Sequence, residues 1–350
     1  MDKENKINIR SLSIEELEKF FIQNGDQSFR ASQVYQWLWQ KGVHDFHGMT
    51  NLSKSTRKLL NKHFVINHIS IHRQQKSKDG TIKILIKLFD GLMVESVLIP
   101  TANRTTACVS SQVGCSFDCK FCATAKIKRM RNLNTDEIYD QVVAIDQQSH
   151  HYYGRPISNI VFMGMGEPLL NYRNLIASID KITKPEGLGI SPSRITVSTS
   201  GLPKIIIKMA DDRVKFGLAV SLHSAIQHIR EKIMPFSVKF PLEELARSLK
   251  YWYKKTSKSV TYEYIIWKDI NDNEKDISAL VNFCKVIPCK VNLIEYNSIE
   301  DDEFFQADSE IVKAYQSTLE ANRIIVTIRR SRGKDIDAAC GQLSNKLVKA

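Results

Sequence analysis

The run Gly114–Cys122 (GCSFDCKFC) places Cys115, Cys119 and Cys122 in a C-x3-C-x2-C spacing. Such a loop supplies three thiolates to one metal centre and leaves a fourth coordination position without a cysteine from the same loop. A cubic iron–sulfur cluster held in this way keeps one iron open to an outside ligand. Zinc is the alternative, because Cys108 can complete a tetrahedral site, but structural zinc sites usually combine paired C-x2-C motifs and this chain has one such pair.

Downstream of this loop the sequence alternates between short apolar runs and amphipathic segments. A helix is expected over 135–148, because Asn134 and Glu137 can form a capping box ahead of apolar residues that share one face. Strands are expected over 160–163, 195–197, 216–220, 260–266, 291–295 and 324–328. This alternation predicts an α/β fold with a parallel sheet flanked by helices.

Small, polar and charged residues follow several of the predicted strands. These segments are GMGEP at 164–168, STSG at 198–201, SLHS at 221–224 and the pair Tyr296-Asn297. In parallel α/β folds the carboxyl ends of the strands form the ligand-binding face. We therefore expect these four segments to converge on one site, close to the cysteine loop.

The first 90 residues predict a helical module followed by a hairpin. Ser13 and Glu16 form a capping box, and Gly25 can end the helix that follows. A second helix is expected over 31–40, and strands over 81–89 and 92–99 with a turn at Asp90-Gly91. The expected division is an accessory, RNA-binding domain over 1–90, which includes the hairpin link, and a catalytic core over 91–350.

Composition narrows the class of protein. The chain has 350 residues, 43% of them hydrophobic, and a formal charge of +12, which favours a polyanionic partner such as RNA. No apolar run reaches the roughly 18 residues that a membrane span needs. Seven cysteines, an odd number, argue against a secreted disulfide framework, so we expect a cytoplasmic protein without membrane contact.

Two basic runs flank the expected site, one after the cysteine loop and one near the C-terminal end. They comprise Lys126, Lys128, Arg129, Arg131, Arg329, Arg330, Arg332 and Lys334. We expect them to position phosphate groups.

With these motifs in place, the chain resembles a known family. The segment 93–142, the motifs GMGEP, VSTSG and SLHS, and the tail VTIRRSRGKDIDAACGQL closely resemble the dual-specificity adenine-C2 RNA methyltransferases of the radical S-adenosylmethionine (SAM) class. The resemblance extends from FRASQVYQWLW at 29–39 to the C-terminal motif. It implies a partial parallel (β/α)6 barrel preceded by an N-terminal helical accessory domain.

The resemblance also implies the roles of individual residues. Cys115, Cys119 and Cys122 would hold one [4Fe-4S] cluster, and two SAM molecules would be used per turnover. Cys340 would carry the methyl group as S-methylcysteine, Cys108 would release it through a transient disulfide, and Glu95 would accept the C2 proton. The residues expected to bind SAM are Gly166, Glu167, Ser198, Ser221, Leu222, His223 and Asn297.

The implied substrate is an adenosine in the peptidyl transferase centre of 23S ribosomal RNA, together with the adenosine 3′ of the anticodon in some transfer RNAs. The implied partners also include a flavodoxin- or ferredoxin-like one-electron reductant, and the chain is expected to act as a monomer. One alternative enzyme is the relative that methylates C8 of the same ribosomal adenosine and confers antibiotic resistance. That group typically has Ala after the Gly-Glu pair, whereas this chain has Pro168, which favours C2. A zinc-stabilised RNA-binding module without catalytic activity is a further alternative, from a different class of protein.

Overall fold

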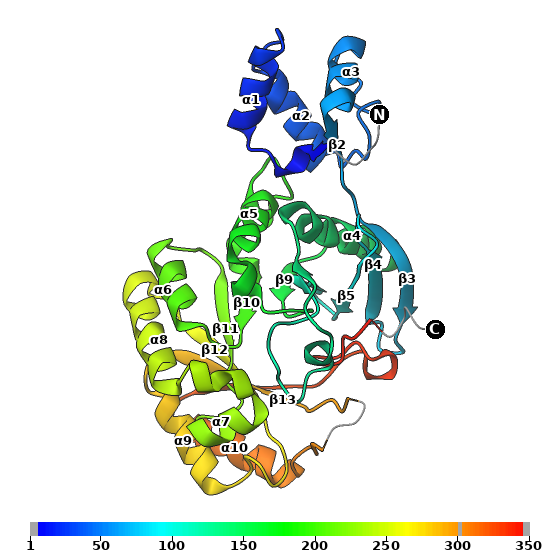
Figure 1. Cartoon of the computed structure of the whole chain (residues 1–350). Helices are drawn as coiled ribbons and strands as arrows, with labels where there is room; N and C mark the ends of the chain where they lie inside the picture. Colours follow the sequence, from blue (N-terminus) through cyan, green and yellow to red (C-terminus); the bar gives the residue numbers. More distant parts are fainter. Residues whose placement is uncertain (1–5, 300–302, 346–350) are drawn as a thin grey trace.

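The computed structural model describes residues 6–299 and 303–345. It consists of a small N-terminal helical module and a larger α/β core (Figure 1). The module contains α1 (Ile14–Gln23), α2 (Arg30–Trp39) and α3 (Lys54–His63), with the short parallel strands β1 (Ile7–Asn8) and β2 (Phe64–Val65). The predicted capping box is present, since the Ser13 hydroxyl accepts from the amide of Glu16 and the Glu16 carboxylate accepts from the amide of Ser13.

The core is built on one ten-stranded sheet with the order β14-β13-β12-β11-β10-β9-β6-β5-β4-β3. Within this sheet, β6, β9, β10, β11, β12, β13 and β14 run parallel to one another. The strands β3, β4 and β5 add an antiparallel edge next to β6. The strand bounds are β3 Ser70–Lys76, β4 Ile82–Lys87, β5 Met93–Pro100, β6 Thr105–Cys108, β9 Asn159–Phe162, β10 Ile195–Thr199, β11 Gly217–Ser221, β12 Val260–Ile265, β13 Cys289–Ile294 and β14 Ile325–Arg329.

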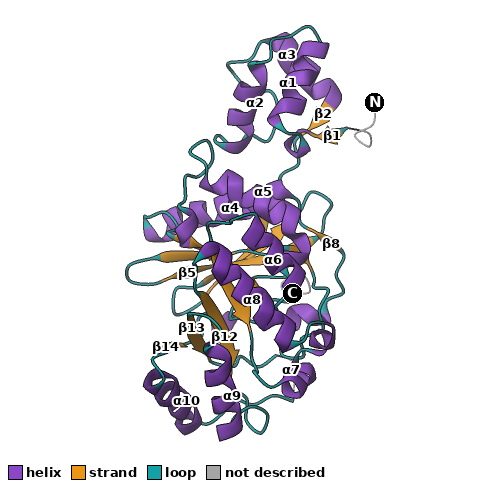
Figure 2. Ribbon diagram, turned by 90° about the vertical axis from the view of Figure 1, so that its left-hand side faces the viewer, coloured by secondary structure: helices purple, strands orange, loops and turns teal. Residues whose placement is uncertain are grey.

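Helices connect successive parallel strands, so that six strand–helix units lead from β6 to β14. The helices are α4 Thr135–Tyr153, α5 Tyr172–Thr183, α6 Pro203–Asp211, α7 Gln227–Ile233, α8 Leu242–Thr256, α9 Glu274–Cys284 and α10 Ser309–Ala321. Figure 2 shows that α4 and α5 lie between the N-terminal module and the rest of the core. The predicted parallel sheet with flanking helices is thus confirmed, and each predicted strand lies within about two residues of an observed one.

The antiparallel edge is the part of the core that alternation alone did not predict. The hairpin about Asp90-Gly91 is present as β4 and β5, but β5 also pairs with β6, the first parallel strand. The hairpin therefore extends the core sheet. None of the helices in the described parts of the chain is long and apolar enough to cross a bilayer.

A buried ion pair joins the module to the core. The Arg10 guanidinium donates two 2.7 Å hydrogen bonds to the carboxylate of Asp140 on α4, and it also stacks 4.4 Å from the centre of the Trp39 ring. Trp39 in turn packs edge-on against Tyr139, with ring centres 5.2 Å apart. These contacts fix how the module sits on α4.

Candidate active site

A cavity of about 230 Å³ lies at the carboxyl ends of the parallel strands. Most of the residues singled out from the sequence line it, although they come from segments far apart in the chain. Those that line it are Cys108, Cys115, Cys119, Cys122, Gly166, Glu167, Ser198, Ser221, His223 and Cys340. The expected convergence of the post-strand segments is confirmed, because the carboxyl ends of neighbouring parallel strands meet at one edge of the sheet.

The cysteine loop begins after Gly114, and the chain returns to its start at Lys128, which forms a bridge with Cys115. Gly114 has φ +74°, and a Cβ on it would lie 2.6 Å from the Lys128 carbonyl oxygen, so only glycine allows this close return. Phe117 stacks on Phe236 with ring centres 3.9 Å apart, and Phe121 packs against Trp267 at 5.1 Å. The two phenylalanines thus anchor the loop in an aromatic cluster and exclude water from it.

The three loop thiols suit a metal cluster. Burial raises the pKa of the Cys115 thiol to about 12, and burial together with the charges of Cys122 and Cys115 raises the pKa of Cys119. Burial makes free thiolates unfavourable, and bound iron would offset the free-energy cost of deprotonating these thiols. In residues 6–299 and 303–345, no group of three His, Cys, Asp or Glu side chains is arranged around a single metal ion.

Arg230 is a functional candidate that sequence reasoning missed. Its guanidinium is fully buried, donates to the carbonyls of Leu222 and Ser200, and lies close enough to Cys119 for the two charges to interact. Its Nη1 has no hydrogen-bond acceptor among the described residues. A buried cation here favours negative charge on the cysteine loop, which fits an anionic cluster. A single arginine in a helix carries no sequence signal for this role.

The Gly166-Glu167 pair forms a polar cradle in the cavity. Gly166 has φ +93°, and a Cβ on it would lie 2.5 Å from the side chain of Gln112. Glu167 is buried, and its two carboxylate oxygens accept from the amides of Leu169 (3.0 Å) and Ser200 (2.8 Å). Burial raises the pKa of Glu167 and the Ser200 amide opposes that rise. The carboxylate is therefore held in one orientation, as an acceptor for the ammonium group of a SAM methionine moiety would be.

His223 follows β11 with the left-handed φ of +56°. Its Nδ1 accepts from the amide of Ile265 at 3.2 Å, and burial together with the charge of Arg230 lowers its pKa to about 3. The ring is therefore neutral at ordinary pH, and it lines the cavity. The other two residues expected around SAM do not line the cavity: Leu222 is fully buried, and Asn297 instead donates to the carbonyl of Cys340 at 3.4 Å.

The two remote cysteines meet beside one arginine. Cys108 ends β6 and Cys340 lies in the C-terminal segment, and both line the cavity together with Arg329. Burial raises the pKa of Cys108 to about 12, the charge of Cys340 adds to the rise and Arg329 opposes it. Arg329 is held by Glu263, whose two carboxylate oxygens each lie 3.4 Å from its Nη1. A cation beside two thiols favours thiolate chemistry there.

The C-terminal segment lies beside the cysteine loop, red against teal in Figure 1. The Gly341 carbonyl accepts from the amide of Ala123 at 2.7 Å, and the Leu343 carbonyl accepts from the Thr124 hydroxyl at 2.6 Å. Glu95 on β5 is fully buried beneath this segment and does not line the cavity. One of its carboxylate oxygens accepts from the amide of Ser344 at 2.8 Å.

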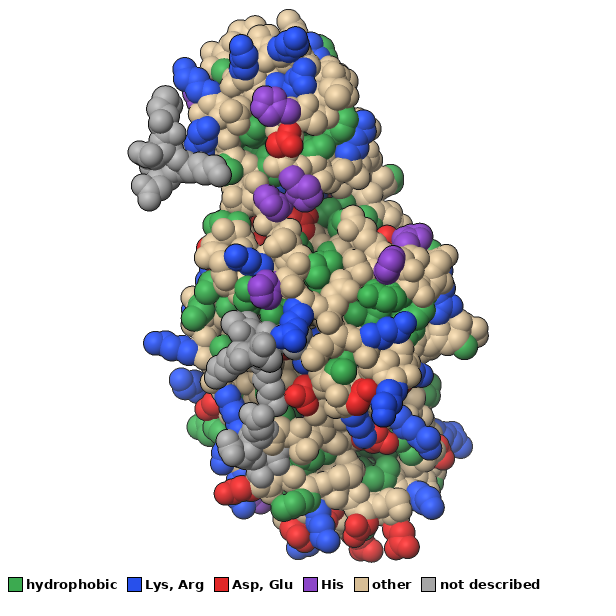
Figure 3. Space-filling view, turned by 90° about the vertical axis from the view of Figure 1, so that its right-hand side faces the viewer, with side chains coloured by type: hydrophobic (Ala, Val, Ile, Leu, Met, Phe, Trp, Pro, Cys, Tyr) green, Lys and Arg blue, Asp and Glu red, His purple; other side chains and the backbone are tan. Residues whose placement is uncertain are grey.

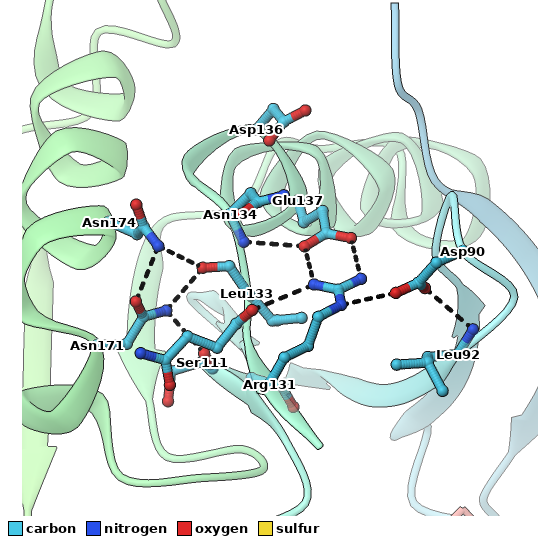
Figure 4. A network of polar contacts seen from close by, with 12 residues as sticks. Asp90, Leu92, Ser111, Arg131, Leu133, Asn134, Asp136, Glu137, Asn171 and Asn174 are labelled. Atoms are coloured by element: carbon cyan, nitrogen blue, oxygen red, sulfur yellow. Dashed lines mark hydrogen bonds and ion pairs between the residues drawn. The ribbon is translucent and has the colours of Figure 1, made fainter. Parts of the chain in front are cut away.

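The basic runs are less available for phosphate than the sequence predicts. The Arg131 guanidinium donates to the Glu137 carboxylate at 2.7 and 2.8 Å and to Asp90 at 2.7 Å, which ties the end of the cysteine loop to α4 and to the hairpin turn (Figure 4). Lys334 pairs with Glu295 at 2.9 Å. These two cations are paired with acidic side chains in this structure, and the expected role of the basic runs in positioning phosphate stays a prediction. Arg330 and Arg332 do line the cavity.

Comparisons with known proteins agree with this geometry. The family model described as the ribosomal RNA large subunit methyltransferase N-terminal domain matches residues 7–66, and that of the radical SAM superfamily matches residues 109–281. A probable dual-specificity RNA methyltransferase RlmN of Christiangramia forsetii is 65% identical, covering 98% of each chain. The dual-specificity RNA methyltransferase RlmN of Geotalea uraniireducens is 40% identical and covers 99% of this chain and 98% of its own.

Among solved structures, a radical SAM methyltransferase from Sphaerobacter thermophilus superimposes with a TM-score of 0.89 at 36% identity, covering 96% of this chain and 99% of its own. Both family models thus match this chain, and the relatives align with it over almost the full length. The chain belongs to the RlmN family of radical SAM RNA methyltransferases.

Proposed function

We propose that this enzyme methylates C2 of adenosine in the peptidyl transferase centre of 23S ribosomal RNA, and C2 of the adenosine 3′ of the anticodon in some transfer RNAs. The observation that carries the proposal is the single cavity wall on which the cysteine loop, Cys108 and Cys340 lie together. The proposed reaction needs a [4Fe-4S] cluster, SAM and a methyl carrier. The cluster loop and the methyl carrier must both lie within reach of the same substrate atom.

In this proposal Cys115, Cys119 and Cys122 hold the cluster, and Glu167 receives the SAM ammonium group in the cradle at Gly166. Ser198, Ser221 and His223 form the cavity wall around the cofactor, with Leu222 and Asn297 behind them. When bound, the cluster and SAM supply the radical that takes a hydrogen atom from the methyl group carried by Cys340.

The remaining chemistry falls to the chain's own side chains. Cys340 carries the carbon to C2 of the adenine and stays bonded to it. The adduct gives up one electron, which the oxidised cluster would accept, and its C2 proton, which Glu95 accepts. The Cys108 thiolate then attacks the Cys340 sulfur. The S–C bond breaks with its electron pair going to the methylene carbon, which takes up a proton to become the methyl group. The resulting disulfide needs two electrons from a reductant before the next turnover.

The N-terminal module is proposed to bind RNA. Its helix α3 exposes Lys54, Lys58 and Lys62, which at a spacing of four residues share one face. Figure 3 shows Lys and Arg side chains over this end of the molecule. We place the domain boundary near residue 66, where the N-terminal family model ends, because the strands that follow join the core sheet.

The enzyme is further proposed to act in the cytoplasm as a monomer, with a flavodoxin- or ferredoxin-like protein as electron donor. Its RNA substrates reside in that compartment.

The decisive experiment compares ribosomal and transfer RNA from cells with and without the gene. Digestion to nucleosides and mass spectrometry should show 2-methyladenosine only when the gene is present. The appearance of 8-methyladenosine alone would assign the chain to the C8 enzymes. Anaerobically purified protein should carry about four irons per chain. A colourless protein that holds one zinc would exclude the radical enzyme and support the zinc-stabilised RNA-binding module.

Variants at the two remote cysteines test the thiol pathway. Cys108→Ala should retain a covalent protein–RNA adduct, because no thiol is left to release Cys340. Cys340→Ala should abolish both methylation and adduct, and normal turnover by that variant would refute its role. Cys284→Ala is the control, since this buried cysteine lies on α9 and does not line the cavity.

A further inference from the structure

A buried ion pair lies next to the cavity, and one of its two members, Lys83, has no part in the chemistry above. The ammonium group of Lys83 on β4 is 3.6 Å from Oε1 of Glu95 on β5, and the two side chains are 3% and 0% exposed. Lys83 is paired in register with Val97, two residues beyond Glu95 on the same strand. Val97 lines the cavity, so the pair lies at the edge of the site.

The two oxygens of the Glu95 carboxylate have different surroundings. Oε2 accepts from the amides of Ser344 at 2.8 Å and Asn345 at 3.1 Å. Oε1 is buried and has no hydrogen-bond donor among the described residues, so the Lys83 ammonium is the charge that compensates it there. A buried carboxylate oxygen without a partner is unfavourable, and the Lys83 ammonium offsets that cost.

Lys83 also contacts the segment that carries the methyl group. Its Nζ lies 3.4 Å from the backbone carbonyl oxygen of Asp337, three residues before Cys340. One cation therefore bridges the proposed proton acceptor and the base of the methyl-carrying segment.

We propose that Lys83 is a positioning residue for the resolution of the RNA adduct. It directs the Glu95 oxygen that accepts no hydrogen bond and aligns that oxygen with the Cys340 segment. The inference rests on the proposed function, since it takes Glu95 as the acceptor of the C2 proton. In that transfer the C2–H bond breaks, its electron pair stays with the purine ring, and the proton adds to the carboxylate.

The test uses full-length enzyme with a reconstituted cluster and an RNA substrate that carries hydrogen or deuterium at C2 of the target adenosine. Lys83→Gln removes the charge but keeps a donor for Asp337, and Lys83→Arg restores the charge. Lys87→Met is the matched control, because Lys87 lies on the same strand but is exposed. The readouts are S-methylation of Cys340, measured on its peptide by mass spectrometry, and the rate of 2-methyladenosine formation.

We expect Lys83→Gln to methylate Cys340 as the wild type does but to form product about 10- to 100-fold more slowly. Deuterium at C2 should slow this variant further and leave the wild type unaffected, because proton removal has become rate-limiting. Lys83→Arg should recover most of the rate, and Lys87→Met should lose none. A purely structural role would not create an isotope effect.

Product formation by Lys83→Gln within about twofold of the wild type would overturn the inference. So would loss of Cys340 methylation in this variant, because Lys83 would then support the whole site and not the proton acceptor. A wild-type enzyme that methylates Cys340 but yields no 2-methyladenosine would instead refute the proposed function. Failure of the inference about Lys83 can therefore be distinguished from failure of the proposed function.

Discussion

The amide of Ala123 donates a 2.7 Å hydrogen bond to the carbonyl of Gly341, so the residue after Cys122 is tied to the residue after Cys340. The cysteine loop and the C-terminal segment that contains Cys340, more than 200 residues apart in sequence, are thereby joined backbone to backbone. This contact sets the position from which Cys340 faces the cavity.

Thr124 provides a side-chain test of this junction. Its hydroxyl donates to the Leu343 carbonyl at 2.6 Å, and Thr124→Val removes that donor with little change in shape. A buried neutral hydrogen bond is worth roughly 1 kcal/mol, so S-methylation of Cys340 should slow about fivefold, normalised to bound iron. Thr327→Val, at an exposed position on β14, should leave the rate unchanged. Equal rates in both variants would show that the junction does not position Cys340.

Glu167 should control the affinity for SAM. In Glu167→Gln the amide nitrogen must face one of two backbone donors, from Leu169 or Ser200, and the charge that would meet the SAM ammonium group is lost. A charge-assisted hydrogen bond contributes about 1.5–3 kcal/mol, so the dissociation constant should rise by about 10- to 150-fold in anaerobic calorimetric titration. Glu186→Gln, at an exposed position, is the control. Unaltered affinity in Glu167→Gln would remove Glu167 from the cofactor site.

His223 should make the fold less stable in acid. Its pKa is lowered to about 3 by burial and by Arg230, whereas an unfolded histidine titrates near 6.5. Between these values the unfolded chain binds a proton that the folded chain does not, so the free energy of unfolding falls as pH drops below about 6.5. From pH 7 to 5 the loss due to this residue is on the order of 2 kcal/mol.

His223→Asn should abolish that part of the pH dependence. Asparagine tolerates the left-handed backbone, and its side-chain oxygen can accept the Ile265 amide in place of Nδ1. Urea unfolding at pH 7 and pH 5 gives the comparison, with His228→Asn at an exposed position as the control. If His223→Asn loses as much stability on acidification as the wild type, another group is responsible.

Arg10 should anchor the N-terminal module on the core. Arg10→Met leaves Asp140 without its partner in a largely buried place, and breaking such a pair costs about 3–5 kcal/mol. The midpoint of urea unfolding should fall accordingly. In contrast, Arg247→Met breaks the exposed pair with Glu243, whose loss should cost less than about 1 kcal/mol. Similar midpoints for the two variants would show that the buried pair does not stabilise the fold.

Much of this architecture could be predicted from local sequence. Capping boxes at Ser13 and Asn134 mark where α1 and α4 begin, because a cap depends on residues three apart. The parallel sheet follows from the spacing of apolar runs, and the gathering of the post-strand segments follows from the common direction of the strands. The cysteine loop could be recognised for the same reason, since its three thiols lie within eight residues.

The sequence by itself determined the order of the strands and helices along the chain and the cysteine loop, because these depend on short-range spacing. Only the tertiary structure decided which charges remain available. Arg131 is neutralised by Glu137 and Asp90, Arg230 lies buried beside Cys119, and Lys83 meets Glu95 across two antiparallel strands. Charge pairing acts over a few ångströms in space and is indifferent to distance along the chain, so no local pattern could have shown it.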